Sequence, residues 1–192
     1  MSCLAGKTIL VTGAGQGIGK ALCLKLAENG ATVIALSRTR NHLDELVHEN
    51  CNILPVQVDL SNWQETKQAL SCINNIDGLV NNAGIALNAP LLQITEEQID
   101  RSFSINVKAL INVTQTVVPK MIEKKQGSIV NVSSQASLSP FEKLMQTVQD
   151  LSVLEEWLNN YCSMLAGHGV INTLTIWFVS QKIHACRELN EA

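Results

Sequence analysis

The chain of 192 residues is long enough for one domain with a substantial core and short for two. Hydrophobic residues make up 46% of it and charged residues 16%, which excludes a disordered chain. The net charge of −3 argues against nucleic-acid binding, and no apolar run is long enough to span a membrane. Without an export signal or a C-x-x-C pair, we expect six reduced cysteines, no metal site and a cytoplasmic location.

Strand and helix patterns alternate cleanly through residue 134, with short β-branched apolar runs between amphipathic stretches. This alternation predicts an α/β fold, a Rossmann-like doubly wound parallel sheet with helices on both faces. We expect strands at 7–13, 31–38, 52–60, 76–84 and 128–134, and helices at 18–30, 41–50, 62–73 and 96–124.

Two helices carry the sequence signature of a capping box. Ser61 with Gln64 is expected to cap the third helix, and Thr95 with Gln98 the long fourth one. In each pair a hydroxyl and a glutamine would satisfy backbone N–H groups that the first turn leaves unpaired.

The pattern changes abruptly after residue 137. Residues 141–165 favour a helix, 170–180 a sixth strand, and 181–192 a short amphipathic or frayed tail. We therefore divide the chain into a Rossmann-like core at 1–137 and a divergent segment at 138–192. The sheet is expected to be incomplete at its C-terminal edge, with an unprotected edge strand.

The stretch "TGAGQGIG" lies between the first strand and the first helix. Glycines in such a turn let backbone N–H groups approach a pyrophosphate, and the helix N-terminus adds its positive dipole. A plain glycine-rich turn is the alternative, but the strand–turn–helix context favours a nucleotide site. The candidate cofactor-binding residues here are Thr12, Gly13, Gly15, Gln16, Gly17, Ile18 and Gly19.

The end of the second strand is expected to select the cofactor. A carboxylate there would bind the ribose 2′-hydroxyl of NAD, whereas a basic residue accommodates the 2′-phosphate of NADP. The sequence "ALSRTR" contains Ser37, Arg38 and Thr39 and no carboxylate. An arginine pair in solvent at a helix start is the alternative; the position favours NADPH as the cofactor.

Five motifs in order carry a resemblance to the short-chain dehydrogenase/reductase family over about residues 4–137. They are the glycine-rich turn at 12–19, "VDL" at 58–60, "NNAG" at 81–84, "SINVKA" at 104–109 and "NVSS" at 131–134. The resemblance implies an NADPH-dependent carbonyl reductase that acts on small ketones, α-dicarbonyls or ketoses. It also implies that Asp59, with Leu60, binds the adenine and that Asn82, Ala83 and Gly84 form the floor of the cofactor site.

The resemblance further implies catalytic roles, of which one pair is missing. Asn106 would hold a helix distortion and an ordered water, and Ser134 would hydrogen-bond the substrate carbonyl. The family's proton-donating tyrosine, with a lysine four residues on, is replaced in register by Thr147 and Leu151.

The only tyrosine, Tyr161, is far out of that register, so catalytic competence is doubtful. The alternatives are a reductase, a non-catalytic dinucleotide-binding chain that pairs with full-length subunits through its long helix, and a chain that does not fold stably. By family we expect a homo-oligomer.

Overall fold

The computed structural model describes residues 3–86, 91–134, 173–179 and 182–186. In this part of the chain, seven strands form one sheet in the order β3-β2-β1-β4-β5-β6-β7. The order runs outward from β1 in both directions, which confirms the doubly wound parallel sheet. The strands are β1 (Thr8–Thr12), β2 (Thr32–Ser37), β3 (Ile53–Gln57), β4 (Gly78–Asn81), β5 (Ser128–Ser134), β6 (Thr173–Val179) and β7 (Lys182–Cys186).

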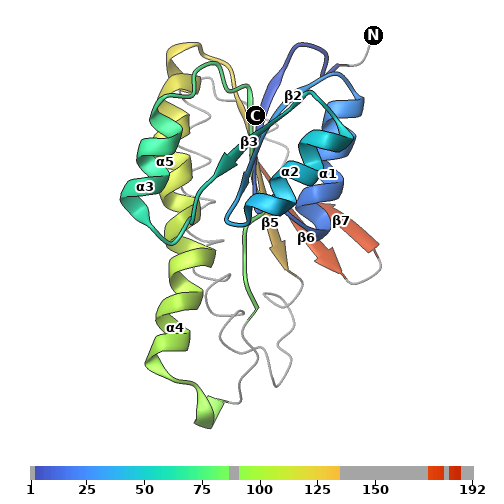
Figure 1. Ribbon diagram of the computed structural model, residues 1–192. Coiled ribbons are helices and arrows are strands. Elements are labelled where there is room, and N and C mark those ends of the chain that lie inside the picture. The colour runs from blue at the N-terminus through green and yellow to red at the C-terminus, as the bar shows by residue number, and fades with distance from the viewer. Residues whose placement is uncertain (1–2, 87–90, 135–172, 180–181, 187–192) are drawn as a thin grey trace.

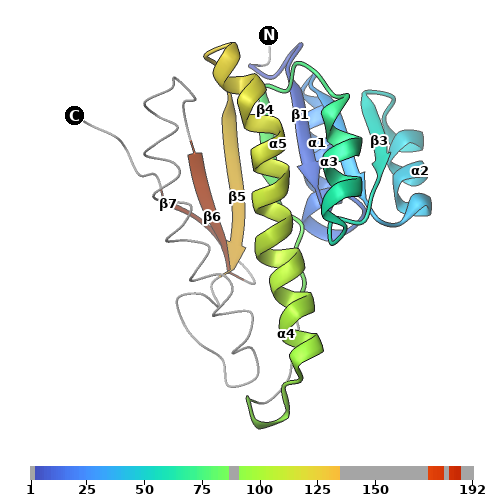
Figure 2. The same ribbon diagram turned by 90° about the vertical axis from the view of Figure 1, so that its left-hand side faces the viewer.

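Helices cover both faces of the sheet (Figures 1 and 2). We call the side with α1 (Gly17–Glu28) and α2 (Arg40–Glu49) the α1 face. The opposite side is the α5 face, and it carries α3 (Trp63–Ser71), α4 (Glu96–Phe103) and α5 (Ala109–Glu123). A π-helical segment, Ser104–Lys108, joins α4 to α5, so the predicted long helix is continuous but contains a widened turn.

Alternation along the strands sends one set of side chains to each face. On the α5 face, Leu10, Leu79 and Ile129 from three neighbouring strands pack against Val117 and Met121 of α5. All five are at most 2% exposed. A second cluster on the α1 face combines residues of β1, β2 and β3 with α1 and α2.

The cap at α4 confirms the prediction, whereas the cap at α3 does not. Thr95 and Gln98 exchange both bonds of a capping box. At α3 the N-cap is Asn62, whose side chain accepts the Glu65 N–H at 3.2 Å. Because α3 begins at Trp63, Ser61 lies one residue before the N-cap, and its hydroxyl instead donates to Asp59 Oδ1 at 2.7 Å. The expected Ser61–Gln64 box is therefore wrong.

The C-terminal part of the sheet differs from the prediction in one respect. A parallel strand, β6, lies within the range 170–180 where one was expected. Part of the expected tail is also a strand, β7, which pairs antiparallel with β6 and protects its outer edge. The helix expected at 141–165 lies outside the described residues. Among the helices that the structure describes, none combines the length and apolarity needed to cross a bilayer.

Candidate functional site

A cavity of about 400 Å³ opens at the carboxyl ends of the strands, between the turns that follow β1, β2, β3 and β4. This is the edge at which open α/β sheets bind ligands, beside the point where the strand order reverses. Every predicted cofactor-binding residue except Thr12 lines it. The structure thus brings together four segments that are separated by about 20 residues each in the sequence: Gly13 and Gly15–Gly19, Ser37–Thr39, Asp59–Leu60, and Asn82–Gly84.

The turn after β1 has no room for side chains at two glycines. A Cβ on Gly19 would overlap the carbonyl oxygen of Gly13 and lie 2.6 Å from Asn82 Nδ2. Gly13 has φ +65°, and a Cβ there would approach the Ala83 Cα to 2.8 Å. Glycine is required here for close contact between the turn and the β4 loop as well as for conformation.

The N-terminus of α1 faces this cavity, with Gly17, Ile18 and Gly19 in its lining. Gln16 is the N-cap, and its side chain makes no capping hydrogen bond. The N–H groups of the first turn therefore have no competing side-chain acceptor at the cap, and they carry the positive end of the helix dipole. This glycine-lined cradle fits the pyrophosphate of a dinucleotide.

Thr12 lies beneath the cavity and not in its wall. Its side chain is 2% exposed, and its hydroxyl accepts the N–H groups of Asn82 and Ala83, both at 3.0 Å. Asn82 Nδ2 in turn donates to the carbonyls of Thr12 and Gly13 at 3.0 and 3.2 Å. This clasp holds the β1 and β4 turns together, so Thr12 positions the cradle and does not line it.

The two arginines after β2 have different surroundings. Arg40 Nε pairs with Asp44 Oδ1 at 2.9 Å, one turn along α2. Arg38 lines the cavity and has no ion pair within the described residues. Ser37 and Thr39 lie beside it, and the Ser37 hydroxyl accepts the Thr39 N–H at 3.3 Å. Of the two cations, Arg38 is the one placed to meet an anionic group of a ligand.

Asp59 lies in the wall opposite the glycine turn. Partial burial acts to raise the pKa of this carboxyl, but hydrogen bonds from the Ser61 hydroxyl and N–H outweigh it. The positive charges of Arg38 and Arg101 add to them, so the pKa lies below its usual value. Asp59 is therefore an anionic acceptor at neutral pH.

Asn106 occupies the π-helical segment and is 6% exposed. Its side-chain amide accepts the Ile85 N–H at 2.8 Å and donates to the Ile85 carbonyl at 3.0 Å. It also donates to the Ser102 hydroxyl at 3.2 Å. Asn106 thus coincides with the expected helix distortion and fastens the loop after β4 to that helix.

The remaining predicted catalytic positions are only partly described. Ser134 is the last residue of β5, opposite Phe178 in the pairing with β6. Thr147 and Leu151, and the single tyrosine Tyr161, lie outside the described residues. The described residues thus include the cavity that was predicted to hold a cofactor, but neither Thr147 nor Leu151.

Sequence reasoning missed five residues of the cavity. Leu36 directly precedes Ser37, and Val58 directly precedes Asp59. Their presence therefore follows from the predicted strand ends. Ile105 neighbours Asn106, and Ile85 follows the asparagine-rich turn. His42 had no sequence signal, because its place depends on how α2 packs beside the glycine turn. The five are Leu36, His42, Val58, Ile85 and Ile105.

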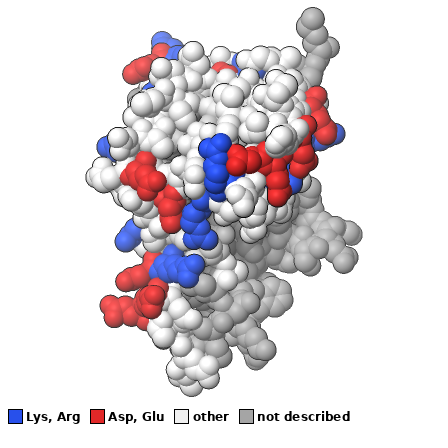
Figure 3. All heavy atoms as spheres, viewed as in Figure 1, with Lys and Arg blue, Asp and Glu red and all other residues white. Residues whose placement is uncertain are grey.

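The described part of the chain shows its surface charges, its possible metal ligands and four of its cysteines. On the face shown in Figure 3, acidic and basic side chains are interspersed, without one broad field of a single sign over the described atoms. No cluster of metal-ligating side chains occurs in the described residues. Cys3, Cys23, Cys51 and Cys72 are free thiols.

Comparison with known proteins supports the family that the five sequence motifs resemble. A family profile described as "short chain dehydrogenase" matches residues 7–146. L-xylulose reductase of Mus musculus is 53% identical over 135 residues, which are 70% of this chain and 55% of that protein. Carbonyl reductase [NADPH] 2 of Sus scrofa is 46% identical over 134 residues, which are 69% and 55% of the two chains. The chain thus spans little more than half the length of these curated relatives.

Solved structures agree on the fold. One titled "short chain dehydrogenase/reductase family protein" superposes with a TM-score of 0.86 at 25% identity, covering 91% of this chain and 75% of the other. Serine dehydrogenase from Escherichia coli superposes with a TM-score of 0.81 at 29% identity, over 87% and 82% of the two chains.

The stretches "LVTGAGQGIG", "RSFSINVKA" and "SIVNVSSQAS" resemble L-xylulose reductase within this family, and the relatives confirm that resemblance. The family profile matches well over half of the chain. The sheet order and the glycine-rich turn in the cavity agree with this match. The chain belongs to the short-chain dehydrogenase family.

Proposed function

We propose that the chain binds NADPH in the cavity at the carboxyl ends of β1 to β4 and that it is an oxidoreductase of the carbonyl-reductase kind. The observation that carries the cofactor choice is Arg38, a cation in the cavity wall beside the hydroxyl side chains of Ser37 and Thr39. Guanidinium and hydroxyl groups suit a 2′-phosphate, whereas the ribose 2′-hydroxyl of NADH would need a carboxylate at this position.

The rest of the cavity supplies the other contacts that a dinucleotide needs. The turn at Gly13–Gly19 would take the pyrophosphate and Asp59 the adenine amino group. Asn82, held by its bonds to the β1 turn, would keep the floor of the site rigid. When bound, NADPH would supply a hydride to a carbonyl carbon.

The test is the affinity for NADPH and NADH, measured by titration calorimetry on the full chain. Arg38→Asp should weaken NADPH binding by about tenfold to a hundredfold, because it removes a charge-assisted contact and adds a repulsive carboxylate. NADH affinity should be unchanged or higher. Arg40→Asp is the matched control: Arg40 pairs with Asp44, and its replacement should leave the NADPH-to-NADH ratio close to that of the wild type.

Equal weakening by Arg38→Asp and Arg40→Asp would contradict the role of Arg38. A wild-type preference for NADH would contradict the cofactor choice itself.

The proposed substrates are small ketones, α-dicarbonyls or ketoses such as L-xylulose, as the names of the relatives suggest. Reduction leaves an alkoxide that must gain a proton. The register positions of the family's tyrosine and lysine hold Thr147 and Leu151, and a threonine hydroxyl is too weak an acid for that role. Loss of a general acid alone costs about 10² to 10⁴ in rate, so we expect turnover slower by at least that factor.

Oxidation of NADPH by the purified chain, first with diacetyl and then with L-xylulose, tests this part. Steady protein-dependent oxidation that is lost in Tyr161→Phe would assign the acid to Tyr161. No oxidation, together with measurable NADPH binding, would leave a chain that binds the cofactor without catalysis.

That non-catalytic alternative is a cofactor-binding chain that pairs with full-length subunits or with its own copies through α4 and α5. Ile99, an apolar residue of α4 that is 40% exposed, is the observation in its favour. Co-expression with a complete homologue tests it, and the absence of mixed oligomers would contradict it. The free exposed thiols of Cys3, Cys51 and Cys72 accord with the proposed cytoplasmic location.

A further inference from the structure

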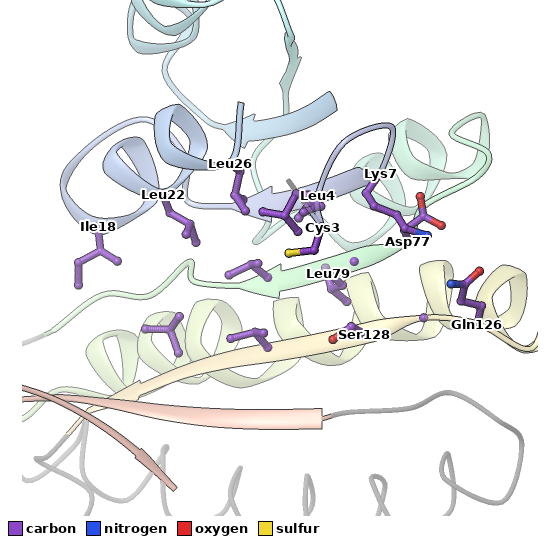
Figure 4. A pocket seen from close by; sticks show the side chains of 16 residues that line it. Cys3, Leu4, Lys7, Ile18, Leu22, Leu26, Asp77, Leu79, Gln126 and Ser128 are labelled. Atoms are coloured by element: carbon purple, nitrogen blue, oxygen red, sulfur yellow. The ribbon is translucent and has the colours of Figure 1, made fainter. Parts of the chain in front are cut away.

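A second and larger cavity lies on the α1 face and adjoins the cofactor cavity at Ile18, which lines both. It has a volume of about 690 Å³ and forms an apolar trough between α1 and the strands β4 and β5 (Figure 4). Ile18, Leu22 and Leu26 of α1 line one side, and Val130 and Val132 of β5 line the other. Ile18 is 44% exposed, and the other four side chains are half-buried. Such a surface is unusual in a parallel sheet, whose strands are normally covered on both faces.

The strand order explains why the trough is open. The connections β1-to-β2 and β2-to-β3 advance toward one edge of the sheet and place α1 and α2 on the α1 face. Connections that advance toward the other edge are assigned by the right-handed rule to the α5 face, as α3 and α4–α5 show. β7 pairs antiparallel with β6, and no described helix lies between these two strands. No described element therefore covers β4 and β5 on the α1 face.

The shape of the trough suits a helix. Ile18, Leu22 and Leu26 are spaced four residues apart, so they form one ridge along α1, roughly 12 Å long. The labelled side chains of this ridge point toward β4 in Figure 4. A neighbouring helix packs about 8–10 Å from such a ridge, which is about the width of two strands in a sheet. A helix laid beside α1 would therefore cover β4 and β5.

The charges at one end of the trough indicate the direction of that helix. Lys7 and Asp77 lie together at the end where α1 terminates (Figure 4). The Asp77 carboxylate is paired with Lys124 at 3.0 Å, so Lys7 leaves a net positive charge there. The C-terminus of a helix carries a partial negative charge. A helix parallel to α1 would bring that end to Lys7.

We propose that this trough is a docking site for an amphipathic helix of a separate partner polypeptide, which would lie beside α1 with its C-terminal end at Lys7. The helix would carry apolar side chains at positions i, i+4 and i+8 and acidic residues in its last turn. A helix set into an apolar groove is a recurring mode of peptide recognition.

Cys3 provides a direct readout, because it is an exposed thiol in the wall of the trough. Cys51 and Cys72 are exposed elsewhere and serve as internal controls. Burial raises the pKa of the Cys23 thiol to about 12, so Cys23 should not react. The experiment follows iodoacetamide modification of each cysteine in the full chain by peptide-resolved mass spectrometry.

The probe is a synthetic amphipathic peptide of about four helical turns with leucine at i, i+4, i+8 and i+11 and glutamates in its last turn. At a concentration near ten times its Kd it should slow modification of Cys3 about tenfold and leave Cys51 and Cys72 unaffected. A peptide of the same composition in scrambled order should not protect Cys3. This comparison needs no variant of the protein and therefore decides the question even where a variant fails to fold.

Two variants locate the contact. Leu22→Glu should abolish protection of Cys3, because it places a charge in the apolar wall. Val47→Glu is the matched control, since Val47 lies on α2, is 36% exposed and is not part of the trough. Circular dichroism checks that both variants are folded.

Several outcomes would overturn the proposal. These are no protection by the peptide, equal protection by the scrambled peptide, and equal slowing at all three exposed cysteines. Protection of Cys3 that grows with protein concentration without any peptide would identify a second copy of the chain as the occupant. Protection by dodecanoate but not by the peptide would assign the trough to an apolar small molecule.

Discussion

The two faces of the sheet differ in how completely they are covered over the same strands. On the α5 face, β4 and β5 present Leu79 and Ile129 to a core that α5 closes with Val117 and Met121. On the α1 face β5 presents Val130 and Val132, which remain half-buried in an open trough, whereas Val80 of β4 is only 6% exposed. The strand sequences carry apolar residues on both sides. The difference comes from the direction of the connections, which place a helix over one face and none over the other.

This comparison predicts that one substitution has very different costs on the two faces. Leu10→Ala on the α5 face should lower the free energy of unfolding by about 2–5 kcal/mol, because Leu10 is fully buried and leaves a cavity. Leu22→Ala in the trough should cost about 1 kcal/mol or less, since that side chain is already partly in solvent. Urea unfolding of both variants measures the difference. Equal costs would mean that the trough is closed in solution.

The covered α5 face also contains a buried pair of asparagines, and the stability cost of buried polar groups provides a second test of the comparison. Asn81 Nδ2 donates to Asn131 Oδ1 at 2.9 Å and to Thr114 Oγ1 at 3.2 Å. In the structure Asn81 Oδ1 and Asn131 Nδ2 have no partner. By contrast, the side-chain amide of Asn82, one residue further on, donates to two backbone carbonyls of the β1 turn.

We expect Asn81→Ala to cost about 1–3 kcal/mol, because it leaves Asn131 and Thr114 buried without their donor. Replacing Asn81 and Asn131 together by alanine should cost less than the sum of the two single alanine changes, since it removes the unpaired atoms as well. A double-mutant cycle from urea unfolding measures this coupling. Strict additivity would show that the pair does not interact.

The smallest predicted effect is a pH dependence at the edge where the trough and the α5 face meet. Partial burial acts to raise the pKa of Asp77, but hydrogen bonds from the Thr8 N–H and Lys124 outweigh it, with added attraction from Lys124 and Lys7. The folded pKa is therefore below the unfolded value. The stabilisation is fully present above the unfolded pKa of about 4 and is lost as the pH falls through the folded pKa.

Asp77→Asn should therefore be less stable than the wild type at neutral pH, and the difference should close as the pH falls below about 4. Urea unfolding at a series of pH values tests the trend. Asp44→Asn is the control: Asp44 pairs with Arg40 in an exposed position, and its loss should change stability little. A difference between Asp77→Asn and the wild type that stays constant with pH would contradict the assigned role of the carboxylate.

The sequence by itself determined most of the core fold and the cofactor cavity. The glycine-rich turn, "ALSRTR", "VDL" and "NNAG" each follow a buried strand, and the carboxyl ends of parallel strands meet at one edge. The capping box at Thr95 was also predictable, because its geometry is local. Local signals sufficed for all of these.

Only the tertiary structure decided the features that depend on distant neighbours. Thr12 proved to be a clasp beneath the cavity because its hydroxyl meets Asn82 and Ala83, about 70 residues away. At α3 the capping role predicted for Ser61 belongs to Asn62, and the Ser61 hydroxyl donates to Asp59. The trough on the α1 face is invisible in the sequence, because a half-buried valine and a fully buried one look alike. Which valine is covered depends on the order and handedness of the strands.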